Sequence, residues 1–222
     1  MFSEAFGLSS LLIFDLDGTI ADTKYSISEA VNITLAHFGK PLATPEDVER
    51  AMGNGALMLI RRLLPEADRE NEELVRTVFE HYDRTYDQTC MNAPFYDGMK
   101  ETMLELKRRG YKLAVLSNKQ DKYVKKIIEN YFSADFFDFV QGQTALPIKP
   151  DPTVPLMIAE ALGVSPSECA FIGDSEVDVL TAKNAGMTGV ACAWGYRPER
   201  LLKEGNPEFL IHAPRELLKI FN

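Results

Sequence analysis

Two aspartates, Asp15 and Asp17, follow four apolar residues, Leu11 to Phe14, and are followed by Gly18. Acids two residues apart share one side of an extended chain, and a glycine permits a tight turn whose N–H groups approach an anion. Open α/β sheets bind ligands at the carboxyl ends of their strands. The stretch therefore predicts two carboxylates at a ligand-binding edge. A solvated turn is the alternative, whereas the alternating ligands of a calcium loop are missing after Gly18.

Three further groups of polar residues follow along the chain, two of them after an apolar run. Ser117 and Asn118 come after the next apolar run, Lys149 lies in a proline-rich loop, and Asp174 with Asp178 follows a third apolar run. Each group alone also fits an ordinary role, as a helix entry, a solvated lysine or an acid that complements a helix dipole. If the strands are neighbours, all four groups converge on one pocket.

The charges of this set indicate which chemistry it would do. Crowded carboxylates repel one another and tend to take up protons, and a hard divalent cation such as Mg²⁺ removes that penalty. A metal site beside a lysine and hydroxyl or amide donors suits a phosphate dianion. One acid would attack phosphorus as a covalent nucleophile. The other would move the proton of the leaving oxygen, which requires surroundings that keep it protonated above the ordinary Asp pKa of about 3.9.

Taken together, these motifs resemble the haloacid dehalogenase superfamily of phosphatases over the whole chain. Asp-Leu-Asp-Gly-Thr from Asp15 is similar to its nucleophile motif, and Ser117, Lys149 and the Gly-Asp-Ser-Glu-Val-Asp run to Asp178 are similar to its other motifs in order. The resemblance implies a Rossmann-like core, Mg²⁺ as cofactor and a phosphoaspartyl intermediate. Because Asp17 is present, it also implies a phosphatase and not a dehalogenase.

The resemblance also assigns roles to individual residues. Asp15 would be the nucleophile and a metal ligand, and Asp17 the general acid and base, with its backbone carbonyl on the metal. Asp174 would bind Mg²⁺ and Asp178 would support it. The residues expected to bind substrate around the phosphoryl group are Gly18, Thr19, Ser117, Asn118 and Lys149.

Strands that alternate with helices predict an α/β fold with a parallel sheet and right-handed crossovers. Expected strands are 11–14, 112–116, 139–141, 169–172, 189–193 and 209–211, with helices at 121–131, 153–162 and 176–185 between them. Residues 25–89 show only helical patterns. We therefore expect a Rossmann-like core, residues 1–22 and 90–222, with an inserted all-helical cap, residues 23–89.

Within the superfamily the chain is similar to the phosphoglycolate phosphatase group, so phosphoglycolate is the expected substrate. Pyrophosphatases and nucleotide or sugar phosphatases of the same family are the alternatives. We expect specificity to lie in the cap, at the loop Gly53, Asn54 and Gly55 with nearby Arg61 and Arg62, because glycine N–H groups and an arginine can bind a small carboxylate. The alternative is that the glycines only separate two helices and both arginines are solvated.

The composition and net charge exclude some classes of binding partner. The 222 residues carry a formal net charge of −9, which argues against nucleic acid or an anionic membrane as a partner. The three cysteines are too few and too scattered for a disulfide framework or a zinc site. The first ten residues resemble no signal peptide, and a cytoplasmic monomer or homodimer is expected. A phosphorylatable receiver module and a catalytically inactive binding protein are the non-enzyme alternatives, but the cap and the complete set of acids favour an enzyme.

Overall fold

Six parallel strands form one sheet in the order β3-β2-β1-β4-β5-β6. The computed structural model describes residues 10–222, so the expectation that the first ten residues form no signal peptide concerns a segment almost wholly outside the described residues. The parallel α/β sheet expected from the sequence is confirmed. The strands are β1 (Leu11–Phe14), β2 (Lys112–Gln120), β3 (Phe139–Gln143), β4 (Cys169–Gly173), β5 (Thr188–Cys192) and β6 (Phe209–Ile211).

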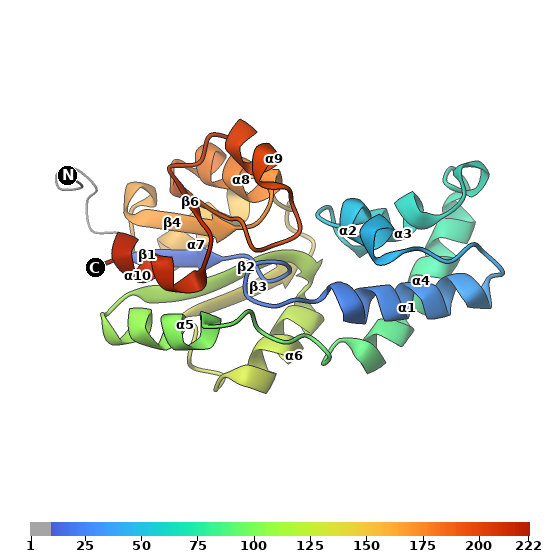
Figure 1. Cartoon of the computed structure of the whole chain (residues 1–222), viewed down its shortest axis with the longest axis horizontal. Helices are drawn as coiled ribbons and strands as arrows, with labels where there is room; N and C mark the ends of the chain where they lie inside the picture. Colours follow the sequence, from blue (N-terminus) through green and yellow to red (C-terminus); the bar gives the residue numbers. More distant parts are fainter. Residues whose placement is uncertain (1–9) are drawn as a thin grey trace.

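Helices cover both faces of this sheet (Figure 1). The expected helices following β2, β3 and β4 are present with ends within a residue of their predicted positions. Three core helices were not predicted, 99–108, 199–204 and 217–220. The longest of them has buried methionines that recur at helical spacing, Met99 and Met103. The helices of the core are α5 (Met99–Arg108), α6 (Asp121–Tyr131), α7 (Thr153–Ala161), α8 (Glu176–Ala185), α9 (Glu199–Glu204) and α10 (Leu217–Ile220).

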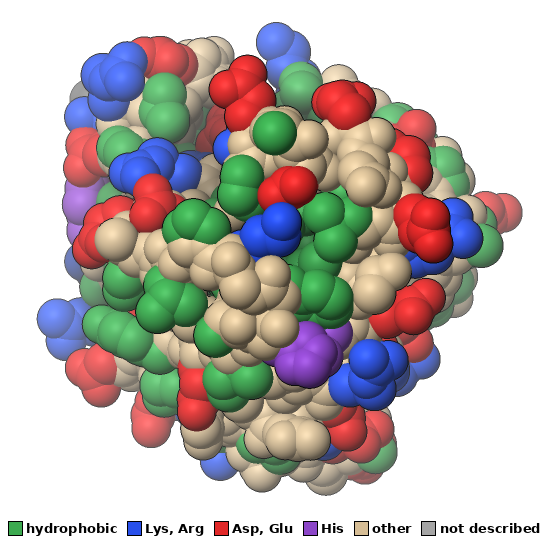
Figure 2. All heavy atoms as spheres, turned by 90° about the vertical axis from the view of Figure 1, so that its right-hand side faces the viewer, with side chains coloured by type: hydrophobic (Ala, Val, Ile, Leu, Met, Phe, Trp, Pro, Cys, Tyr) green, Lys and Arg blue, Asp and Glu red, His purple; other side chains and the backbone are tan. Residues whose placement is uncertain are grey.

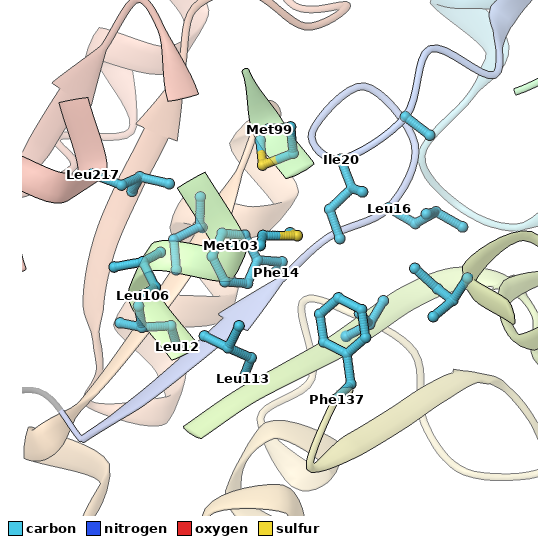
Figure 3. Packing of buried hydrophobic residues seen from close by; sticks show 14 of the residues in the cluster. Leu12, Phe14, Leu16, Ile20, Met99, Met103, Leu106, Leu113, Phe137 and Leu217 are labelled. Atoms are coloured by element: carbon cyan, nitrogen blue, oxygen red, sulfur yellow. The ribbon is translucent and has the colours of Figure 1, made fainter. Parts of the chain in front are cut away.

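Strand β1 lies at the centre of the sheet and is buried on both sides. Leu12 and Phe14 pack in the cluster that includes α5 and α6, whereas Leu11 and Ile13 pack in the cluster that includes α7 and α8. Figure 3 shows the first cluster, with Phe14 beside Met103. This alternation follows from the two-residue period of a strand, and it explains why a short uninterrupted apolar run forms the central strand of a parallel sheet.

Four helices between β1 and β2 pack around an apolar cluster of their own, made largely of side chains from residues 27–90. They are α1 (Lys24–His37), α2 (Pro45–Ala51), α3 (Ala56–Leu63) and α4 (Glu72–Thr89). Figure 1 shows them together beyond the carboxyl end of the sheet. The stretch Thr44-Pro45-Glu46-Asp47 is typical of a helix start, and in the structure Thr44 and Asp47 form a capping box at the beginning of α2, with proline in the first turn. We keep the name cap for residues 23–89.

The outer surfaces of the molecule carry charges of both signs. Seen from the cap side, acidic and basic side chains are interspersed among hydrophobic ones (Figure 2). All three cysteines, Cys90, Cys169 and Cys192, are buried and free. Within residues 10–222, none of the helices combines the length and the apolar character needed to cross a membrane.

Candidate active site

The predicted acids converge where the central strands end. Asp15 follows β1, Asp174 follows β4, and Asp178 lies in the first turn of α8, and one oxygen from each lies within 4.8 Å of the others. β1 and β4 are paired residue by residue, and the Asp15 N–H donates to the carbonyl of Ile172 at 2.9 Å. Pairing of neighbouring strands is therefore what brings acids about 160 residues apart in the sequence into one cluster.

Lys149 lies among these acids. Its Nζ is 3.0 Å from Asp15 Oδ2 and 2.6 Å from Asp178 Oδ1, and its side chain is only 3% exposed. The peptide bond between Lys149 and Pro150 is cis. The ammonium therefore partly compensates the charge of two buried carboxylates. From the sequence alone, a lysine in a proline-rich loop could equally have been solvated.

The cluster keeps an excess of negative charge. Burial raises the pKa of Asp15 to about 7, with Lys149 opposing and the nearby acids Asp178 and Asp17 adding to the increase. Burial also raises the pKa of Asp174 well above its ordinary value, with repulsion from Asp178 and Asp15 as further causes. Both shifts express the same imbalance, because three carboxylates face a single ammonium.

That imbalance fits a divalent cation. Two formal negative charges remain after Lys149 is counted, and hard carboxylate oxygens are the ligands that Mg²⁺ prefers. Glycines leave room for the acids: a Cβ at Gly18 or Gly195 would collide with the Asp174 carboxylate, and one at Gly173 would collide with Asp178. The acid cluster is thus held tightly by close backbone approach on several sides.

Asp178 also shapes its own helix. Its Oδ2 accepts hydrogen bonds from the N–H and hydroxyl of Ser175, and the two residues form a capping box at the start of α8. Both of its oxygens therefore have partners, Ser175 on one and Lys149 on the other. Asp178 therefore caps α8 and also belongs to the acid cluster.

Asp17 lines the same cavity as Asp15. Its Oδ1 accepts a hydrogen bond from the Thr23 hydroxyl at 2.6 Å and lies 3.0 Å from the Nζ of Lys119. The sequence motifs predict no role for Lys119, the residue after Asn118. The register of β2, which continues past Leu116 to Gln120 with an irregularity, positions it here.

The side chain of Asn118 connects three parts of the molecule. Its amide donates to the carbonyls of Gly53 in the cap and of Lys149, and its Oδ1 accepts from the Lys149 N–H. The amide is thereby fully used within the protein, so any phosphoryl contact from Asn118 must come from its backbone. Ser117 is buried beside it, and its hydroxyl accepts only a 3.3 Å hydrogen bond from the Lys119 N–H, which leaves its O–H available to donate.

Gly18 and Thr19 lie in a turn whose donors are already occupied. The Gly18 N–H donates to Ala21 and the Thr19 N–H donates to Leu16. The Thr19 hydroxyl donates to Asp174 Oδ1 at 3.2 Å. Neither residue lines the main cavity. These contacts shape the turn and hold Asp174, and the direct substrate contact expected from the sequence stays a prediction.

The predicted cap loop reaches the site only in part. Gly53 and Gly55 line the cavity, but the Asn54 side chain turns to Arg62, whose other donor binds the carbonyl of Ala51. Arg61 is bound to Glu72 and to the carbonyl of Arg69. The expectation that Arg61 or Arg62 faces the substrate is therefore wrong, because local cap contacts hold both guanidinium groups.

A different arginine lines the cavity. Arg197, from the loop after β5, donates to the carbonyls of Glu49 and Met52 at the end of α2 and lies 3.4 Å from Glu176. Its neighbour Tyr196 also lines the cavity, and the Tyr196 hydroxyl accepts hydrogen bonds from the N–H groups of Thr23 and Lys24 at the entry to α1. These two residues fasten the cap to the core, and no local sequence signal marks them.

The cavity between cap and core is small. It has a volume of about 80 Å³, whereas sites for drug-sized ligands are about 300–1,000 Å³. Polar walls come from the acid cluster, Ser117 and Lys119, and apolar walls come from cap residues such as Ile27 and Leu59. The arrangement can hold a small anion and can exclude much of the solvent around it.

Comparison with known proteins agrees with this geometry. The family model described as haloacid dehalogenase-like hydrolase matches residues 12–192. The chain is similar to phosphoglycolate phosphatase 1 of Pseudomonas aeruginosa, with 35% identity over 215 residues that cover 95% of this chain and 79% of that protein. It is also similar to the phosphoglycolate phosphatase of Vibrio parahaemolyticus, with 33% identity and 95% coverage of each chain. The crystal structure of a predicted phosphoglycolate phosphatase from Haemophilus somnus superposes with a TM-score of 0.91 at 28% identity, covering 98% of this chain and 100% of that chain.

Proposed function

The chain belongs to the haloacid dehalogenase-like hydrolases and is a phosphatase, and from the geometry of its site we propose that Asp15 attacks phosphorus in a Mg²⁺-dependent reaction. The observation that carries the proposal is the buried cluster of Asp15, Asp174 and Asp178 around Lys149. Asp15 and Asp174 would hold the cation, together with the backbone carbonyl of Asp17, and Asp178 would support it. When bound, the cation supplies positive charge that offsets the repulsion between acids and phosphate.

Asp15, Asp17 and Lys149 carry out the nucleophilic attack, the proton transfers and the charge neutralisation. An oxygen of Asp15 forms a bond to phosphorus as the bond from phosphorus to the ester oxygen breaks. Asp17 donates its proton to that leaving oxygen and later takes one from the water that attacks the phosphoaspartate. The bond from phosphorus to Asp15 then breaks and phosphate leaves. Lys149, 3.0 Å from Asp15 Oδ2, neutralises charge on the nucleophile and on the phosphoryl group.

The substrate we propose is a small phosphomonoester, with phosphoglycolate as the first choice. Relatives that cover the chain almost end to end are phosphoglycolate phosphatases, and a cavity of about 80 Å³ suits a short leaving group better than a nucleoside or sugar. Residues 23–89 act in this proposal as a cap domain that encloses the leaving group. A phosphate-release screen over small phosphomonoesters, sugar phosphates, nucleotides and pyrophosphate, with and without Mg²⁺, tests the choice.

Asp15→Asn tests the nucleophile. The variant should lose Mg²⁺-dependent hydrolysis of an aryl phosphate while the circular-dichroism spectrum stays that of the wild type, because the amide is nearly isosteric and cannot attack phosphorus. Asp151→Asn, an exposed acid in the loop after Lys149, is the matched control and should retain activity. Mass spectrometry of acid-quenched wild type should find one phosphoryl group on the peptide that contains Asp15. Activity of Asp15→Asn within about tenfold of wild type removes Asp15 as the nucleophile.

A further inference from the structure

One buried hydroxyl in the cavity makes no hydrogen bond of regular geometry. Among buried side-chain atoms of residues 10–222, this holds only for Ser28 Oγ and the Tyr86 hydroxyl, although Lys119 and Ser26 lie close enough to interact with the Tyr86 hydroxyl. Ser28 does not line the main cavity, but Tyr86 does, from α4 of the cap, and it is 1% exposed. A buried donor without such a hydrogen bond is unfavourable by about 1–3 kcal/mol. A hydroxyl kept in that state at the wall of a cavity indicates a partner supplied by a ligand.

A buried cation lies next to this hydroxyl. The Nζ of Lys119 is 4.7 Å from the centroid of the Tyr86 ring and 3.0 Å from Asp17 Oδ1, and its side chain is 7% exposed. The opposite charge of Asp17 favours the charged form of this buried amine. The pair therefore offers an ammonium and a phenol as donors.

The pair is also correctly placed for a particular leaving group. Asp17 is the acid proposed to protonate the ester oxygen, so that oxygen must lie beside Asp17. In an ester of a 2-hydroxy acid, the carboxylate carbon is only two bonds from the ester oxygen. A carboxylate in that position lies within reach of a cation 3.0 Å from Asp17, and it accepts hydrogen bonds from several donors at once.

We propose that Lys119 and Tyr86 form the specificity subsite of this phosphatase and bind the carboxylate of a leaving group that carries it on the ester carbon. The inference rests on the proposed function and deepens it, because it names the chemical class of the alcohol. Lys119 contributes charge from the core, and Tyr86 contributes a directed O–H from the cap. The subsite is thus complete only with the cap closed, the state held by Arg197 and Asn118.

A pair of substrates that differ in one group tests the proposal. The kcat/KM for 2-phosphoglycolate is compared with that for 2-hydroxyethyl phosphate, in which an uncharged hydroxymethyl group replaces the carboxylate. Tyr86→Phe should reduce the ratio of the two by about tenfold or more, the usual effect of losing a hydrogen bond to a charged group. Lys119→Met should reduce it further, and Lys119→Arg should restore part of it. Ser28→Ala, which removes the other buried hydroxyl without a regular hydrogen bond, should leave the ratio unchanged.

The outcomes separate the subsite from the reaction. If Lys119→Met slows both esters equally and Tyr86→Phe does not change the ratio, Lys119 only positions Asp17 and the subsite proposal fails. Wild type that hydrolyses both esters equally well overturns the subsite alone and leaves the phosphatase mechanism standing. Wild type that hydrolyses an aryl phosphate but neither ester overturns the choice of phosphoglycolate and the subsite with it, and leaves the role of Asp15 standing. Wild type that hydrolyses no phosphate ester overturns the proposed function as well. Since Tyr86→Phe removes a single oxygen, the test survives even if a Lys119 variant does not fold.

Discussion

Removing the Lys149 ammonium should destabilise the protein and yet strengthen its binding of a divalent cation. In Lys149→Met, Asp15 and Asp178 lose the cation that lies 3.0 and 2.6 Å from their oxygens, in a setting where all three side chains are at most 12% exposed. Breaking a buried ion pair by deleting one partner typically reduces stability by about 3–5 kcal/mol. We expect a loss of that size in the free energy of unfolding when the metal is chelated.

Mg²⁺ should reverse much of this loss. The variant has three uncompensated carboxylates in place of two, so a divalent cation that binds only the folded state should stabilise it more than it stabilises wild type. Activity should nevertheless stay low, because the charge that Lys149 offers to the nucleophile and phosphoryl group is gone, and such groups are worth about 10²–10³ in kcat. Opposite effects on cation binding and on catalysis distinguish charge compensation from general damage.

The assay is urea unfolding followed by circular dichroism, in EDTA and across a Mg²⁺ titration. Lys149→Arg keeps the charge and is the control. The double variant with Asp178→Asn should recover part of the stability, because it removes one of the acids left without a partner. A loss below about 1 kcal/mol in EDTA, the range of an exposed ion pair, together with an unchanged Mg²⁺ effect, would refute the charge-compensation reasoning.

Three further perturbations test other parts of the molecule. Gly195→Ala places a Cβ against the Asp174 carboxylate, so the Mg²⁺ concentration for half-maximal activity should rise by about tenfold or more, which a metal titration measures. Arg197→Ala removes two hydrogen bonds from core to cap, so steady-state kinetics should show KM for a small phosphate ester rising about tenfold, with a smaller change in kcat. Burial lowers the pKa of His81, and the charge of His37 lowers it further, so the unfolded chain binds the proton more readily. The free energy of unfolding should therefore fall as pH decreases through the ordinary value of 6.5, and His81→Gln should flatten that slope in urea unfolding at several pH values.

The sequence by itself was sufficient to predict most strands and helices of the core. The apolar run 11–14 has no polar position to face solvent, which is typical of a strand buried on both faces, and its alternating packing confirms this interpretation. Asp15, Ser117, Lys149 and Asp174 were predicted to meet at one pocket on the condition that the strands before them are neighbours. The strand order of the structure meets that condition. The helix 99–108 was missed, although its buried methionines follow helical spacing.

Tertiary structure alone decided which polar groups face the cavity and which serve the fold. Arg61 and Arg62 are close in sequence to the predicted cap loop, yet contacts within the cap hold them, while Arg197 reaches the cavity from the far end of the chain. Lys119 and Tyr86 come from different parts of the molecule and meet only when the cap lies on the core. Sequence spacing fixes neighbours within one element, but the partners of a long polar side chain depend on how separate elements pack, and that packing encloses the site.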